Sequence, residues 1–149
     1  MEEIFYNHIN EILSNGPELD YEWQNNNSEI TLKKISPNGF DIILSFDKNF
    51  IYLNTNTGFH YYPNVVVDFT QTLIEVMGLV RDLLSKNMGI KEYCSNGKPY
   101  KWELESLGNN IWMNEGTTRL LFWNYFGKKS QKIYFNETLP IRDLSYNNV

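Results

Sequence analysis

Hydrophobic and polar positions follow two different periods along this chain, and the period distinguishes expected helices from expected strands. In the opening segment the core-facing stripe recurs every three to four residues, the spacing of one helix face: Ile4, Phe5, His8, Ile9, Ile12 and Leu13. Glu2 and Glu3 lie in the expected first turn, where the helix dipole favours acids. Proline cannot continue a helical hydrogen-bond ladder, so Gly16-Pro17 ends the element. The pattern predicts a helix over about residues 2–14.

Residues 21–62 have a period of two, which is typical of strands with one buried face. The strongest stretch places four large side chains on one face: Phe40, Ile42, Leu44 and Phe46. Tyr21 and Trp23 alternate with polar neighbours in the same way, so we expect both to face the core. Turn-forming residues separate the runs, as at Ser36-Pro37-Asn38-Gly39. The segment predicts a meander of four or five antiparallel strands.

A second helix has the clearest signals in the sequence. Asp68 can cap the free backbone amides at its start. A broad apolar stripe follows: Phe69, Leu73, Val76, Met77, Val80, Leu83 and Leu84. Lys86 in the last turn and Gly89 just beyond it are typical stop signals, so the helix is predicted over about residues 69–87. Gly78 costs a helix about 1 kcal/mol relative to alanine, which predicts a close backbone contact there.

The rest of the chain again predicts strands. Asn96-Gly97, the strongest short hairpin signal, separates strands expected over 90–94 and 100–105. Glu115-Gly116-Thr117 is expected to form a turn that leads into a strand over 118–126. A last strand is expected to follow the turn at 127–130.

Alternation within the strand over 100–105 assigns its two faces. Trp102 and Leu104 are expected to face the core, and Glu103 and Glu105 to face water. Two carboxylates on the exposed face of a strand are more typical of a solvated surface than of an acid/base pair.

Together these elements predict an α+β fold, in which antiparallel meanders pack against two helices on one sheet face. The chain of 149 residues has the usual size of one domain, and it contains no Pro-, Ser- or Gly-rich linker. We therefore expect a single domain over residues 1–149.

Charge is distributed unevenly along the sequence. The formal net charge is −5, but residues 1–32 contain seven acids and no Lys or Arg. The first base is Lys33, and bases outnumber acids from there to the end. Five of the acids are expected to form one negative patch without a neutralising base: Glu3, Glu11, Glu18, Asp20 and Glu22. Such a surface can steer a basic protein and pair with its Lys and Arg side chains.

Catalytic chemistry has weak support in the sequence. Cys94 and His60 are the only thiol and base that could act together, and Cys94 lies beside a hairpin turn without a feature that lowers its pKa. Two separated histidines and one cysteine do not have the spacing of a zinc site. We expect no catalytic residue, no metal, no cofactor and no enzymatic activity.

Composition also bears on location and partners. A single cysteine and the absence of an apolar run long enough for a membrane span favour the cytoplasm and no membrane partner. Tyr125, Lys128, Lys129 and Lys132 could contact nucleic acid. Because the whole chain is acidic, however, we expect no nucleic-acid partner.

Four segments from Gly58 onward bear on the class of protein: 58–62, the helix through Leu83-Leu84, 100–105, and 124–130 with Leu139-Pro140 after it. Together they resemble small cytoplasmic bacterial immunity proteins, the partners of secreted toxins. The resemblance implies a class but no individual site residue. It implies a non-enzymatic protein that binds and neutralises a toxin, and the acidic surface would suit a basic toxin domain.

Two other functions stay open at this stage. The aromatic residues, which make up 15% of the chain, could line the cavity of a small enzyme or a small-ligand-binding protein. An exposed strand edge could instead make the chain a structural or assembly component. The partner and the oligomeric state are open as well.

Overall fold

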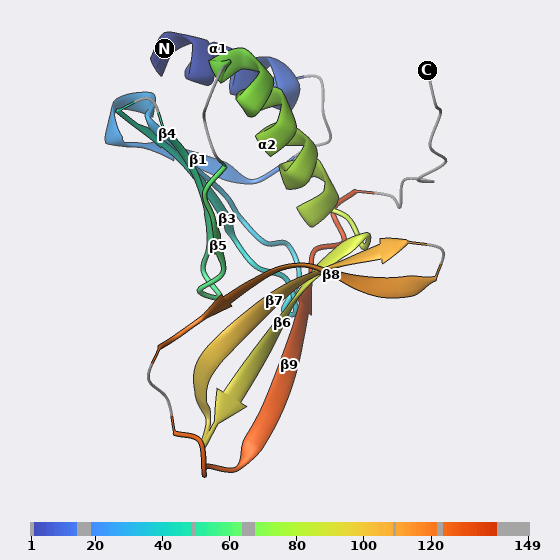
Figure 1. Ribbon diagram of the computed structural model, residues 1–149. Helices are drawn as coiled ribbons and strands as arrows, with labels where there is room; N and C mark the ends of the chain where they lie inside the picture. Colours follow the sequence, from blue (N-terminus) through green and yellow to red (C-terminus); the bar gives the residue numbers. More distant parts are fainter. Residues whose placement is uncertain are drawn as a thin grey trace.

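The computed structural model describes residues 2–14, 19–48, 50–63, 68–108, 110–121 and 124–139 (Figure 1). The described part contains two α-helices, one short 3-10 helix and nine strands: α1 (Glu2–Ser14), β1 (Tyr21–Gln24), η1 (Asn25–Asn27), β2 (Glu29–Leu32), β3 (Ile42–Asp47), β4 (Phe50–Thr55), β5 (His60–Tyr61), α2 (Phe69–Leu83), β6 (Met88–Ser95), β7 (Lys98–Gly108), β8 (Ile111–Arg119) and β9 (Lys129–Phe135). The predicted α+β class is confirmed. Neither helix has the length and apolar composition needed to cross a membrane.

The first sheet is the predicted meander. Its strands follow the order β1-β2-β3-β4-β5, and every neighbouring pair is antiparallel. Alternate residues of β2, β3 and β4 are buried, as a sheet with one packed face requires. The period of two predicted this sheet correctly.

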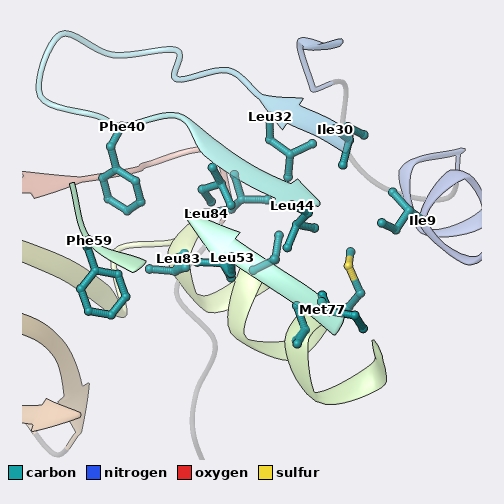
Figure 2. Packing of buried hydrophobic residues seen from close by; sticks show 14 of the residues in the cluster. Ile9, Ile30, Leu32, Phe40, Leu44, Leu53, Phe59, Met77, Leu83 and Leu84 are labelled. Atoms are coloured by element: carbon teal, nitrogen blue, oxygen red, sulfur yellow. The ribbon is translucent and has the colours of Figure 1, made fainter. Parts of the chain in front are cut away.

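Both helices contact the first sheet through aromatic rings. The ring of Phe46 on β3 stacks on Phe5 of α1 with centroids 5.7 Å apart. It also meets Phe69 of α2 edge-on at 5.2 Å. In the core, side chains of the strands and of α2, such as Leu44, Leu53 and Leu83, point toward one another (Figure 2). The core is therefore built mainly from the first sheet and the two helices.

Strand β1 departs from the predicted pattern. Trp23 packs on α1, with its indole N–H donating to Asn10 Oδ1 at 3.2 Å. Tyr21, in contrast, is 43% exposed, so the expectation that it faces the core is wrong. β1 is an edge strand of the first sheet, which leaves its first residue with a neighbouring strand on one side only.

Helix α2 begins where the sequence predicts and ends earlier. The Asp68 carboxylate accepts from the backbone amide of Thr70 at 2.9 Å, which confirms the cap. The helix ends at Leu83 and not near residue 87. Gly89 is not a stop signal but a buried residue of β6, where an added Cβ would lie 2.7 Å from Cδ1 of Phe135. Glycine is needed there because an aromatic ring of β9 covers the strand.

Gly78 of α2 does not serve the predicted contact. The residue is exposed, and an added Cβ would meet nothing within 4 Å. The expected close approach of another backbone is therefore wrong at this position.

The second sheet has the strand order β8-β7-β6-β9 and extends away from the helices (Figure 1). The predicted hairpin joins β6 and β7, and positive φ angles at Asn96 (50°) and Gly97 (76°) are those of its tight turn. β9 pairs with β6, so the last strand crosses to the far edge of the sheet. That pairing is not local in sequence and was not predicted.

Strand β8 corrects the prediction of a turn at Glu115-Gly116-Thr117. It runs continuously from Ile111 to Arg119, and its register against β7 shifts between Leu104 and Glu105. Glu115 is the extra residue of a β-bulge at that point. The strand predicted over 118–126 ends at Arg119.

Asn136 connects the two sheets. Its side chain accepts from the Phe40 amide at 3.1 Å and donates to the Phe40 carbonyl at 3.0 Å. At a second contact Gly58, with φ of 100°, lies against the Trp102 indole. Buried residues of both sheets, including Ile90 and Leu104 of the second, belong to one hydrophobic cluster.

Candidate functional site

Four of the five predicted partner-binding residues belong to the described part of the chain, and all four are exposed. Glu3 and Glu11 are exposed on α1, eight positions apart and therefore on one helix face. Asp20 and Glu22 are exposed at and before β1. Glu18 lies outside the described residues. We call Glu3, Glu11, Asp20 and Glu22 the acidic end.

The acidic end does not form a continuous face. Trp23 packs against the Tyr6 ring of α1, with centroids 4.9 Å apart. Side chains alternate along a strand, so Glu22 points to the opposite side of β1 from α1. The acids of α1 and those of β1 therefore project from different sides of the first sheet.

A base also lies beside these acids, contrary to the expectation of a patch without one. Lys33 Nζ is 3.0 Å from Glu22 Oε2. The hydrogen bond and charge of Glu22 raise the pKa of Lys33, and the charge of Asp20 adds to the effect. This base follows β2, the neighbour of β1, so the pair spans the sheet edge. The acidic end is thus partly neutralised at Glu22.

Cys94 is buried against another acidic side chain. Its thiol lies 3.5 Å from Oε1 of Glu92, a carboxylate that is only 6% exposed. Trp102 Nε1 and the Tyr134 hydroxyl donate to the same carboxylate at 3.2 and 3.3 Å. Burial raises the pKa of the Cys94 thiol, and the hydrogen bond and charge of Glu92 raise it further. The thiol is therefore held in the protonated form, which is a poor nucleophile.

The buried position of Glu92 was not predicted, although the sequence contains a signal for it. Ile90, Glu92 and Cys94 alternate within one predicted strand and must share a face. Ile90 and Cys94 are buried, and Glu92 is buried with them. His60, the base that the sequence offers to Cys94, is exposed, and its ring is tilted against that of Tyr62 with centroids 5.1 Å apart.

The opposite face of the second sheet holds a network of charged residues. Lys91 and Glu105 form an ion pair at 2.9 Å. Glu103 pairs with Lys101 and accepts from the Tyr93 hydroxyl at 2.5 Å. The predicted solvated face is therefore wrong in detail, because Glu103 and Glu105 are partly buried and paired.

The network changes the pKa values of two of its members, Tyr93 and Glu103. Burial raises the pKa of Tyr93 to about 12, and the hydrogen bond to Glu103 adds to the rise. Burial would also raise the pKa of Glu103, but the hydrogen bonds from Lys101 and Tyr93 outweigh it and lower that pKa. The carboxylate thus stays charged while the phenol stays protonated.

The second sheet also exposes large apolar side chains at its far end. We define the tip as the Asn96-Gly97 turn together with Leu120, Leu121 and residues 124–128. Leu121 is 84% exposed and Phe126 is fully exposed, at 100%. No sequence argument identified these two residues, because exposure depends on where the strands end.

None of the family models, curated proteins or solved structures compared with this chain matches it. Among the described residues, no group of three or more His, Cys, Asp and Glu side chains is arranged to hold a metal ion.

Proposed function

We propose that this protein is a non-enzymatic, cytoplasmic protein-binding module of the immunity type, which binds and blocks a basic toxin domain through its acidic end. The observation that carries the proposal is the exposure of Glu3 and Glu11 on α1 and of Asp20 and Glu22 at β1, where Lys33 pairs with Glu22. Acids gathered at one end attract a basic partner and increase its rate of encounter.

Steering does not require one continuous face. Exposed charges act over a Debye length of about 8 Å at physiological salt, so acids on both sides of β1 contribute to the same field. We also propose that both helices cover one face of the first sheet, which the contacts of Phe46 with Phe5 and Phe69 support. Glu22 would then lie on the uncovered face, accessible to a partner.

The environment of the only thiol supports a non-enzymatic role. Cys94 is buried, its pKa is raised, and its thiol donates a hydrogen bond to the carboxylate of Glu92 instead of facing a base. A nucleophilic cysteine requires the opposite conditions.

The experiment is affinity capture from the native host with tagged protein. The variant is Glu18→Lys/Asp20→Lys/Glu22→Lys, and the control Glu75→Lys/Glu115→Lys/Glu137→Lys makes the same charge change at exposed acids elsewhere. A basic protein retained by wild type and by the control, but lost by the variant, is expected. The wild-type protein should also inhibit the purified partner's activity. Equal retention by all three proteins would contradict the proposal.

A further inference from the structure

The tip combines exposed apolar side chains with a fixed backbone. Asn96 exchanges two hydrogen bonds with Lys128: its amide donates to the Lys128 carbonyl at 2.9 Å, and its Oδ1 accepts from the Lys128 amide at 2.8 Å. Ser95 donates to the Asn124 carbonyl at 2.6 Å, and the Phe126 amide donates to Asn124 Oδ1 at 3.0 Å. The loop is therefore tied to the β6–β7 turn, and Phe126 projects from an anchored segment.

Large apolar side chains that are exposed to water are energetically unfavourable. An isolated exposed leucine is ordinary, but Leu120, Leu121, Tyr125 and Phe126 occur together at one end of a sheet, and each is at least 48% exposed. Clusters of this kind mark surfaces that contact a partner or a membrane. The tip is thus a candidate binding surface.

The charged residues in the sequence segments around the tip are all basic. Segments 93–102 and 116–136 contain no Asp or Glu. They contain six bases: Lys98, Lys101, Arg119, Lys128, Lys129 and Lys132. Lys101 is paired with Glu103 and Lys132 lies opposite Glu92 in the β6–β9 register, so four bases lie outside these two pairings: Lys98, Arg119, Lys128 and Lys129. The end of the second sheet is therefore positive, although the whole chain is acidic.

We propose that the tip binds the surface of a membrane that contains anionic lipid. Leu121 and Phe126 enter the interface, and the surrounding bases contact the head groups. A nucleic acid fits less well, because single strands stack on flat aromatic faces and two of the four exposed apolar side chains, Leu120 and Leu121, are aliphatic. The expectation of no membrane partner rested only on the absence of an apolar run long enough to span a membrane. Binding to a membrane surface does not require such a segment.

The test is sedimentation of the full chain with vesicles of phosphatidylcholine alone or mixed with phosphatidylserine. Wild type is expected to bind the mixed vesicles, and to bind less as salt increases. The variant Leu121→Ser/Phe126→Ser should weaken binding by at least about tenfold, since each apolar side chain contributes to partitioning. Lys98→Glu/Lys128→Glu should remove the preference for phosphatidylserine.

Matched controls separate the tip from general stickiness and from the acidic end. Ile35 is 60% exposed but lies outside the second sheet, so Ile35→Ser should bind vesicles like wild type. Asp20→Lys, at the acidic end, should also bind vesicles like wild type. A failure of the toxin-binding proposal can therefore be distinguished from a failure of the membrane proposal. Circular dichroism verifies that each variant is folded.

Two results would overturn the membrane proposal. One is a failure of the wild-type protein to bind mixed vesicles at low salt, or equal binding of these vesicles by wild type and Leu121→Ser/Phe126→Ser. The other is tight binding of a single-stranded oligonucleotide that depends on Lys98 and Lys128 but not on Leu121 or Phe126, without vesicle binding. The second result would assign the tip to nucleic acid.

Discussion

The two sheets of this protein use their faces differently. The first sheet buries one face under apolar side chains such as Leu44 and Leu53, both 0% exposed. The second sheet carries an exposed strand at its edge: all nine residues of β8 are exposed or half-buried. Acids gather beside the first sheet and bases at the end of the second. We therefore expect stability to depend mainly on the first sheet, whereas the proposed contacts with partners lie at exposed ends.

The first prediction contrasts one residue from each sheet. Leu44→Ala should lower the free energy of unfolding by about 2–5 kcal/mol, because it leaves a cavity in a packed core. Ile111→Ala on β8 should change it by less than about 0.5 kcal/mol, since Ile111 is 65% exposed. Urea unfolding measures both. Similar losses for the two variants would mean that the second sheet is as tightly packed as the first.

The second prediction concerns the connection between the sheets. Asn136→Ala should lower the free energy of unfolding by about 2 kcal/mol, because the buried backbone N–H and carbonyl of Phe40 both lose a partner. Hydrogen exchange at the Phe40 amide should become faster in this variant. The exposed Asn114 of β8 provides the control, and Asn114→Ala should leave both measurements close to wild type.

The third prediction uses two glycines with opposite surroundings. Gly58→Ala should destabilise the protein by about 1–2 kcal/mol, because Gly58 has φ of 100° and its Cβ would lie 2.9 Å from Cζ2 of Trp102. Gly78→Ala should stabilise it by about 0.5–1 kcal/mol, because an alanine fits the helix without a clash. Thermal unfolding gives both signs. A destabilising Gly78→Ala would restore the close contact that the sequence suggested.

The fourth prediction is a pH dependence of the second sheet. The pKa of Tyr93 is about 12 in the folded protein, against 10.0 for an unperturbed tyrosine. Above pH 10 the unfolded chain loses this proton first, so stability falls as pH rises from 10 to 12. At pH 11 the free energy of unfolding should be about 1 kcal/mol lower from this cause than it is below pH 10. In Tyr93→Phe, alkaline unfolding curves should show a shallower fall, and an unchanged slope would exclude Tyr93 as the cause.

What the sequence predicted correctly depends on local contacts. The period of two around Ile42 and Leu44 reflects one-sided burial, and Asp68 caps amides only two and three residues away. These signals are complete within a short window. Helix α1 and the first meander were predictable for the same reason.

The errors arise where distant residues decide the structure. Gly89 was interpreted as the end of a helix because the Phe135 ring that covers it lies far along the chain. The glycine of Glu115-Gly116-Thr117 suggested a turn, but pairing with β7 makes Glu115 a bulge. The acidic end could be listed from the sequence, whereas the Lys33–Glu22 pair and the exposed tip depend on strand order.

The central claim, that the acidic end steers a basic partner, is tested most directly by association rates across a salt series. Stopped-flow mixing with the captured partner would compare wild type with Glu18→Lys/Asp20→Lys/Glu22→Lys and with Glu75→Lys/Glu115→Lys/Glu137→Lys. We predict that the first variant associates at least about tenfold more slowly than wild type at low salt, with a flatter salt dependence. The second variant should retain most of the wild-type rate. Equal rates and equal salt slopes for the two variants would contradict the claim.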